Sequence, residues 1–187
     1  MSIDLEKQIL RSKMLEKRKL LTNTQVNDAS HSLLNNLKDI LLPVKNVAIY
    51  HAYKNEISLE QTIQYLLAQH KRIYKPIAYK SSRIMRFDIV NDLSKNNVFA
   101  DENYNYKQEI ECYNLDLILL PLVAVDNDGY RLGQGGGYYD STFEKRNPNT
   151  ILCGVGYQWQ YVNSVPHDKF DIKLDMFVSD EKTTYFK

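Results

Sequence analysis

The sequence predicts a single α/β domain over residues 1–187, with a mostly parallel or mixed sheet flanked by helices on both faces. Apolar residues first recur at helical spacing, and after Pro43 short apolar runs alternate with amphipathic stretches. Strands that alternate with helices are typical of an α/β sheet, because each helix connects two parallel strands. A chain of 187 residues buries about 70% of its unfolded surface around one core.

The elements follow from the spacing of apolar residues. Helices are expected over residues 2–21 and 24–41, and Pro43 ends the second. Further helices are expected from Ser58 to about His70 and over 138–145. Residues 91–113 are polar and irregular. Short apolar runs predict strands at 47–53, 72–79, 83–90, 115–124 (the central strand), 151–157, 176–179 and 183–186.

The composition limits the classes of function. A net charge of +1 argues against a general nucleic-acid coat or a membrane-surface binder, so any anion site must be local. Cys112 and Cys153 fit no metal or redox spacing and are expected to be buried, reduced thiols. The N-terminus lacks an apolar stretch of signal-peptide length, and the run 117–125 is too short for a membrane span. We expect a cytoplasmic monomer that binds neither nucleic acid nor membranes.

A glycine cluster is the most informative local feature. Four of the seven glycines lie between Gly133 and Gly137, after an apolar strand and before a predicted helix. Glycine accepts positive φ and lets the backbone approach an anion closely. Arg131 before the cluster and Asp140 after it favour a nucleotide or phosphate site over the alternative, a plain tight turn. The P-loop pattern is absent, and Tyr138 stands where a dinucleotide fingerprint needs its third glycine.

Charged residues elsewhere suit the same chemistry. Lys7 and Arg11 share a helix face, with Arg18 two turns beyond Arg11, and form either a basic arm over phosphates or a solvated face. Glu56 follows the predicted strand 47–53, where a carboxylate either accepts hydrogen bonds from a heterocycle or begins a helix. Asp140 and Asp175 are either magnesium ligands beside ATP or cap and turn residues.

Together these segments resemble the 5-formyltetrahydrofolate cyclo-ligases, also called methenyltetrahydrofolate synthetases. The segment 126–140, DNDGYRLGQGGGYYD, closely resembles the signature of that family. The Lys7-x-x-x-Arg11 pair with Arg18, the segment 154–160 and the block that runs from Asp171 to Asp175 resemble further family blocks in the same order. The sequence departs from the family at Phe170, where histidine is usual, and at Ser179, where threonine is common.

The resemblance implies a fold related to the sugar-phosphate isomerases and CoA-transferases. It implies ATP- and Mg²⁺-dependent cyclisation of 5-formyltetrahydrofolate to 5,10-methenyltetrahydrofolate, with release of ADP and phosphate. In this reaction the formyl oxygen is phosphorylated, the neighbouring nitrogen attacks the activated carbon and phosphate leaves. No enzyme nucleophile is required, which agrees with the lack of a Ser-His-Asp or Cys-His arrangement.

The resemblance also implies residue roles. Arg131 would stabilise charge on the transferred phosphoryl group, and Asp140 and Asp175 would hold magnesium. Glu56 would fix the pterin, His51 would lie against the substrate, and either Tyr138 or Tyr139 would pack on the folate. The implied ATP-binding residues are Lys7, Arg11, Arg131, Leu132, Gly133, Gln134, Gly135, Gly136, Gly137, Tyr138, Tyr139 and Asp140.

Two other functions stay open at this point. One is a relative of the sugar-phosphate isomerases or CoA-transferases that binds phosphate without ATP hydrolysis. The other is a non-catalytic nucleotide or folate sensor, which the replacement of the usual histidine by Phe170 leaves open.

Overall fold

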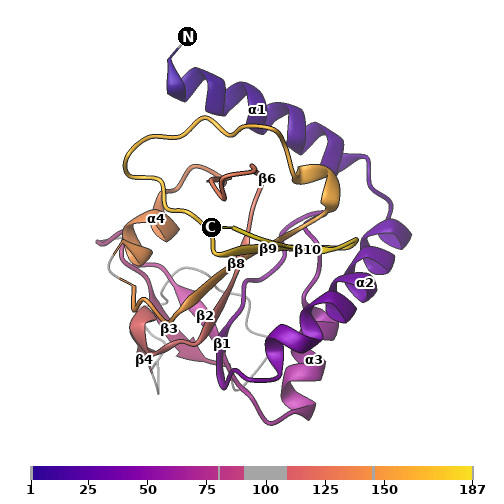
Figure 1. Ribbon diagram of the computed structural model, residues 1–187, viewed down its shortest axis with the longest axis vertical. Coiled ribbons are helices and arrows are strands. Elements are labelled where there is room, and N and C mark those ends of the chain that lie inside the picture. The colour runs from indigo at the N-terminus through magenta and orange to yellow at the C-terminus, as the bar shows by residue number, and fades with distance from the viewer. Residues whose placement is uncertain (1, 80, 91–108, 145, 187) are drawn as a thin grey trace.

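The computed structural model describes residues 2–79, 81–90, 109–144 and 146–186 and is built around an eight-stranded sheet (Figure 1). The order of its strands is β10-β9-β8-β5-β1-β2-β3-β4, and β6 and β7 form a separate hairpin. The bounds are β1 Asn46–Ala48, β2 Arg72–Ile77, β3 Arg86–Ile89, β4 Glu109–Ile110, β5 Leu117–Pro121, β6 Ala124–Val125, β7 Arg131–Leu132, β8 Ile151–Gly156, β9 Met176–Ser179 and β10 Thr183–Tyr185.

The sheet is mixed, with a parallel centre. Strands β9, β8, β5, β1 and β2 are parallel to their neighbours in this group, whereas β3, β4 and β10 add antiparallel edges. The strand order reverses at β1, which pairs with β2 on one side and with β5 on the other. In such sheets the carboxyl ends of the strands beside the reversal open into a crevice where ligands bind.

Helices cover both faces of the sheet, as predicted. Helices α2 (Asn23–Leu41) and α3 (Glu60–Ala68) pack on one face, where Leu33, Leu37 and Leu41 of α2 are fully buried. On the other face, Phe143 of α4 (Tyr138–Phe143) packs with Phe87 and the even-numbered residues of β5. Short 3₁₀ helices lie at Cys112–Asn114 (η1) and Gln158–Gln160 (η2). None of the described helices is long and apolar enough to cross a bilayer.

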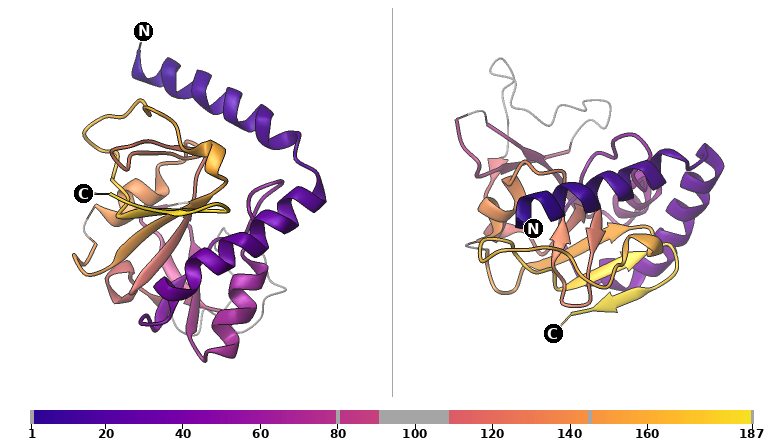
Figure 2. Two further views of the ribbon diagram at one scale, coloured as in Figure 1. Left: turned by 45° about the vertical axis from the view of Figure 1, so that its right-hand side comes forward. Right: turned by 90° about the horizontal axis from the view of Figure 1, so that it is seen from above.

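Helix α1 (Ile3–Lys19) differs from the others because it lies across one end of the molecule instead of on the sheet (Figures 1 and 2). Only Met14 and Arg18 of its residues are buried. Met14 packs with Val123, Leu132 and other residues of a small separate cluster under the helix. The predicted helix is thus correct, although most of its apolar residues do not face a deep core.

Other predictions need correction. The predicted strand 115–124 is two elements, because the chain leaves the sheet after Pro121 and Val123 then donates its N–H to Leu132 O in the hairpin of β6 and β7. The predicted strand 47–53 has ladder pairing only through Ala48. Residues 91–108 of the stretch predicted to be irregular lie outside the described residues, and Glu109–Ile110 form the edge strand β4. Cys112 and Cys153 are both buried, as predicted.

Candidate active site

A cavity of about 630 Å³ opens at the carboxyl edge of the parallel strands. Pro76 and Ala78 from the end of β2 and Pro121 from the end of β5 contribute to its wall. Helix α1, the glycine loop (residues 133–137) and the loop that follows η2 surround the opening. The charged residues among its lining are Asp4, Lys7, Arg11, Glu56, Arg83, Arg131, Asp140, Asp168 and Asp171. The cavity therefore brings together most of the residues predicted for the site.

The glycine loop has the backbone geometry that its composition predicts. Gly135 has φ +99° and Gly137 has φ +68°, both in the region that side chains with a Cβ rarely adopt. Arg11 lies on this loop: its Nε donates to Gly133 O at 3.0 Å. Its guanidinium Nη2 lies 3.6 Å from the position that a Cβ of Gly135 would take. Helix α1 and the loop are thus in direct polar contact.

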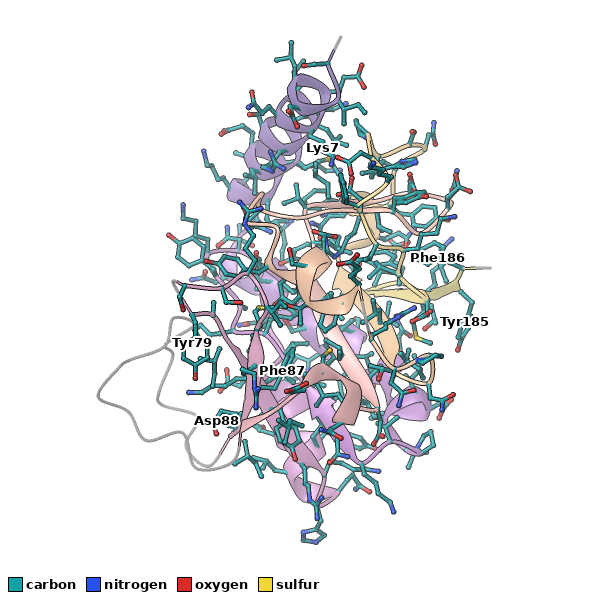
Figure 3. All side chains as sticks on the ribbon, turned by 90° about the vertical axis from the view of Figure 1, so that its left-hand side faces the viewer. Lys7, Tyr79, Phe87, Asp88, Tyr185 and Phe186 are labelled. Atoms are coloured by element: carbon teal, nitrogen blue, oxygen red, sulfur yellow. The ribbon has the colours of Figure 1, made fainter. Side chains whose placement is uncertain are left out.

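Lys7 reaches the site one turn before Arg11 on α1, where the helix meets the body of the protein (Figure 3). Its Nζ lies 2.6 Å from Asp171 Oδ2 and 3.8 Å from Asp168 Oδ2. Both carboxylates belong to the loop between η2 and β9 and line the cavity. An anion that binds Lys7 therefore has to compete with two carboxylates, or Lys7 has to exchange its partners.

Arg131 is a buried cation in the wall of the cavity. The residue is buried, and its Nη2 lies 3.4 Å from Asp140 Oδ1 without forming a hydrogen bond. Among the described residues, neither Nε nor Nη2 of Arg131 has a hydrogen-bond acceptor. Buried donors without acceptors are costly, and a guanidinium does not lose its proton. The site thus offers a fixed positive charge with spare donors, which suits an oxyanion.

Tyr139 lies beside this charge. The Arg131 guanidinium is 5.5 Å from the centre of the Tyr139 ring. Burial raises the pKa of the Tyr139 phenol well above its usual value, and the nearby guanidinium offsets only part of that shift. The phenol therefore stays neutral at all physiological pH values and remains a hydrogen-bond donor. Tyr138 and Tyr139 both line the cavity.

Glu56 is held by three groups from different parts of the chain. Arg18 Nη1 lies 3.3 Å from Glu56 Oε1, and Gln134 Nε2 donates to the same oxygen at 3.3 Å. The Tyr53 N–H donates to Oε2 at 3.0 Å. Arg18 is thus not a third cation of the phosphate-binding arm. It is buried and pairs with the carboxylate predicted to bind the pterin.

The structure does not bring together Asp140 and Asp175, the two predicted magnesium ligands. Asp140 lines the cavity, where its Oδ1 accepts from the Ile172 N–H at 3.3 Å. Asp175 precedes β9, and its carboxylate accepts two hydrogen bonds from Arg146, at 2.6 and 2.9 Å, and one from the Leu152 N–H. Because β8 and β9 are parallel, Asp175 lies at their starting edge, away from the carboxyl ends where the cavity opens.

The described residues do not form a preorganised magnesium site in the cavity. Within the described part of the chain, no three His, Cys, Asp or Glu side chains are close enough to hold a metal ion. His51 and Phe170 are exposed, and neither is among the residues that line the cavity. The structure therefore does not place His51 against a substrate in the cavity.

Four charged residues of the cavity were not predicted from the sequence: Asp4, Arg83, Asp168 and Asp171. Asp171 opens the block that contains Asp175, and it is Asp171 of these two aspartates that lines the cavity and pairs with Lys7. Arg83 follows β2 in a segment without a motif, and no signal in the sequence marks it.

Comparison with known proteins identifies the family of this chain. The sequence model of the 5-formyltetrahydrofolate cyclo-ligase family matches residues 4–180. The 5-formyltetrahydrofolate cyclo-ligase of Haemophilus influenzae is 30% identical over 178 residues, which cover 90% of this chain and 95% of that protein.

Solved structures of two 5,10-methenyltetrahydrofolate synthetases are similar in fold. The Mycoplasma pneumoniae protein superposes with a TM-score of 0.77 at 25% identity, over 93% of this chain and 98% of that one. The Aquifex aeolicus protein superposes with a TM-score of 0.80 at 28% identity, over 97% and 93%. The chain therefore belongs to the 5-formyltetrahydrofolate cyclo-ligase family.

Proposed function

We propose that this protein converts 5-formyltetrahydrofolate to 5,10-methenyltetrahydrofolate with hydrolysis of ATP to ADP and phosphate. The observation that carries the proposal is the buried Arg131 guanidinium, whose Nε and Nη2 lack acceptors among the described residues. It lies beside a glycine loop whose positive-φ residues open the backbone to an anion. A transferred phosphoryl group is the ligand that uses both features, because its charge increases on the non-bridging oxygens.

The reaction needs positioning more than covalent catalysis. The formyl oxygen attacks the γ-phosphorus, the bond to the bridging oxygen of ADP breaks, and a phosphorylated imidate forms. The neighbouring nitrogen of the folate then attacks the formyl carbon, loses its proton and expels phosphate, which closes the ring. Arg131 stabilises the charge on the phosphoryl group in the first step. The protein holds the two substrates together, which converts a bimolecular step into a local one.

The phosphate side of the site consists of Lys7, Arg11 and the glycine loop. Arg11 already contacts Gly133 O, and Lys7 lines the same wall, so a triphosphate along the loop is within reach of both. Magnesium bound to ATP takes one or two protein carboxylates, with phosphate oxygens and water as its other ligands. Asp140 fits that part because it lines the cavity beside Arg131. The ion would neutralise phosphate charge during transfer.

The folate side of the site centres on Glu56. Its carboxylate is buried and lines the cavity, where it can accept hydrogen bonds from the amino and ring N–H groups of a pterin. The raised pKa of Tyr139 keeps its hydroxyl available as a donor nearby. All these groups come from one chain, so the proposed reaction requires no partner subunit.

The test is a coupled measurement on the purified protein. Protein, MgATP and 5-formyltetrahydrofolate are mixed, and the absorbance of the methenyl product and the release of ADP are followed together. We expect equal amounts of both products. The absence of methenyl product at enzyme concentrations near that of the substrate would refute the proposal. ATP binding without turnover would then support a nucleotide sensor, and phosphate binding without ATP binding would support an isomerase-like function.

A further inference from the structure

The cationic side chains around the cavity differ in whether a carboxylate lies close enough to neutralise their charge. Lys7 is paired with Asp171, Arg131 lies near Asp140, and Arg18 behind the wall is paired with Glu56. Arg11 has a backbone carbonyl as its partner. Within the described residues, the guanidinium of Arg83 forms no ion pair with a carboxylate. Arg11 and Arg83 are therefore the cations of the cavity that no carboxylate of the described ranges neutralises.

Both of these arginines lie against the glycine loop. The Arg11 guanidinium is 3.6 Å from the position that a Cβ of Gly135 would take, and Arg83 Nη1 is 3.5 Å from the same position at Gly137. Arg11 comes from α1, whereas Arg83 comes from the connection between β2 and β3. Two separate elements thus deliver guanidinium groups to the loop at points two residues apart. An anion that follows the loop backbone would be within reach of both.

The backbone beside Arg83 is fixed, although its side chain is exposed. The N–H of Met85 donates to Thr142 Oγ1 at 2.9 Å, and this hydroxyl donates to Tyr138 O at 2.6 Å. Met85 and Thr142 are both buried. These bonds connect the segment of Arg83 to α4, the helix that begins directly after Gly137. The position of Arg83 relative to the loop is therefore set by the fold.

We propose that Arg83 is a further nucleotide-binding residue, which holds phosphate oxygens of ATP at the Gly137 end of the glycine loop. Arg11 would hold the same phosphate chain near Gly135. The planar guanidinium suits this role because it donates two hydrogen bonds to one phosphate. This inference rests on the proposed function, since it assumes that ATP is the anion at the loop.

The test compares Arg83→Gln and Arg83→Lys with the wild-type protein. The dissociation constant for MgATP is measured by calorimetry without folate, and KM for both substrates is measured from methenyl formation. We expect Arg83→Gln to weaken ATP binding and raise KM for ATP about tenfold. Arg83→Lys should recover part of the loss, because the charge remains but the fork geometry is lost. KM for the folate and kcat should change less than twofold.

Arg72→Gln is the matched control, because Arg72 is exposed and begins β2 at the opposite edge of the sheet. An ATP affinity of Arg83→Gln within twofold of this control would overturn the inference. A rise in KM for the folate alone would also overturn it, since Arg83 would then bind a folate carboxylate. If the wild-type protein binds ATP without turnover, the proposed function fails while the calorimetric comparison still decides the role of Arg83. If it does not bind ATP, both fail.

Discussion

At the level of single residues, the site depends on charged groups whose partners are far away in the sequence. Lys7 contacts Asp171, 164 residues later, and Gln134 contacts Glu56 across 78 residues. The identity of the cations was predictable, since Lys7, Arg11 and Arg131 carry recognisable spacing. Their carboxylate partners were not, because an aspartate in a loop has no periodicity that gives its direction. Asp171 lines the cavity and pairs with Lys7, whereas Asp175, four residues later, pairs with Arg146.

Arg131 is the residue whose replacement should separate catalysis from binding. Arg131→Ala is expected to lower kcat by two to three orders of magnitude, on the order of the loss for a preorganised donor to transition-state charge. The folate dissociation constant should change less than threefold, because the proposed role of Arg131 is to bind the phosphoryl group and not the folate. Steady-state kinetics and equilibrium folate binding measure the two quantities. Equal losses in both would contradict the assigned role.

Arg18 and Glu56 form a buried ion pair, so the effects of replacing the two residues on the free energy of unfolding should not be additive. Arg18→Met leaves the buried Glu56 carboxylate without its cation and should lower the free energy of unfolding by about 3 kcal/mol. The double variant Arg18→Met/Glu56→Leu removes both charges and should recover most of that loss. Urea unfolding of the two single variants and the double variant measures the coupling. Strictly additive losses would show that the 3.3 Å contact contributes nothing.

At the level of elements, the glycine loop contains glycines that adopt positive φ and glycines that do not. Gly135 and Gly137 adopt positive φ, whereas no positive φ is recorded for Gly133. The cluster in the sequence predicted this loop but did not distinguish the glycines that the backbone requires from those that only provide space. That distinction depends on the turn between β7 and α4, which no local pattern determines.

The two classes of glycine should respond differently to alanine. Gly135→Ala forces φ +99° on a residue with a Cβ and is expected to cost about 1–2 kcal/mol of stability. Gly133→Ala is the control, because its Cβ would lie 3.6 Å from Arg131 Nη1, an ordinary contact. Gly133→Ala should lower the free energy of unfolding by less than half as much as Gly135→Ala. Urea denaturation compares the two variants, and equal losses would disprove that backbone strain is the cause.

At the level of the whole molecule, the parallel centre of the sheet decides which residues can meet. All carboxyl ends of β1, β2 and β5 lie at one edge, and the cavity opens there. Alternating strands and helices predicted this arrangement, as they did the two covered faces. The separate hairpin of β6 and β7 was not predicted, because the apolar run from Leu117 to Val125 continues through the break at Pro121. Hydrophobicity alone did not reveal where the chain leaves the sheet.

Asp175 provides a test of this placement. Asp175→Asn weakens the contact with Arg146 and the bond from Leu152 N–H, which is expected to cost about 1 kcal/mol of stability. The dependence of turnover on magnesium concentration should stay unchanged, because Asp175 lies at the far edge of the sheet. Asp140→Asn should instead raise the magnesium concentration needed for half-maximal rate. Magnesium titrations of both variants distinguish the two roles. A change in the magnesium concentration for half-maximal rate in Asp175→Asn would show that Asp175 is a magnesium ligand after all.

Helix α1 has few buried residues, so it should open locally more easily than α2. Two of its residues are buried, and its other links include the Lys7–Asp171 and Arg11–Gly133 contacts and the bond from Asn55 Nδ2 to Arg18 O. Such a helix opens locally at a lower free energy than α2, whose leucines lie in the main core. Its amide hydrogens should exchange earlier than those of α2, and saturating ATP should slow them by linkage. Exchange along α1 would then report nucleotide occupancy without turnover.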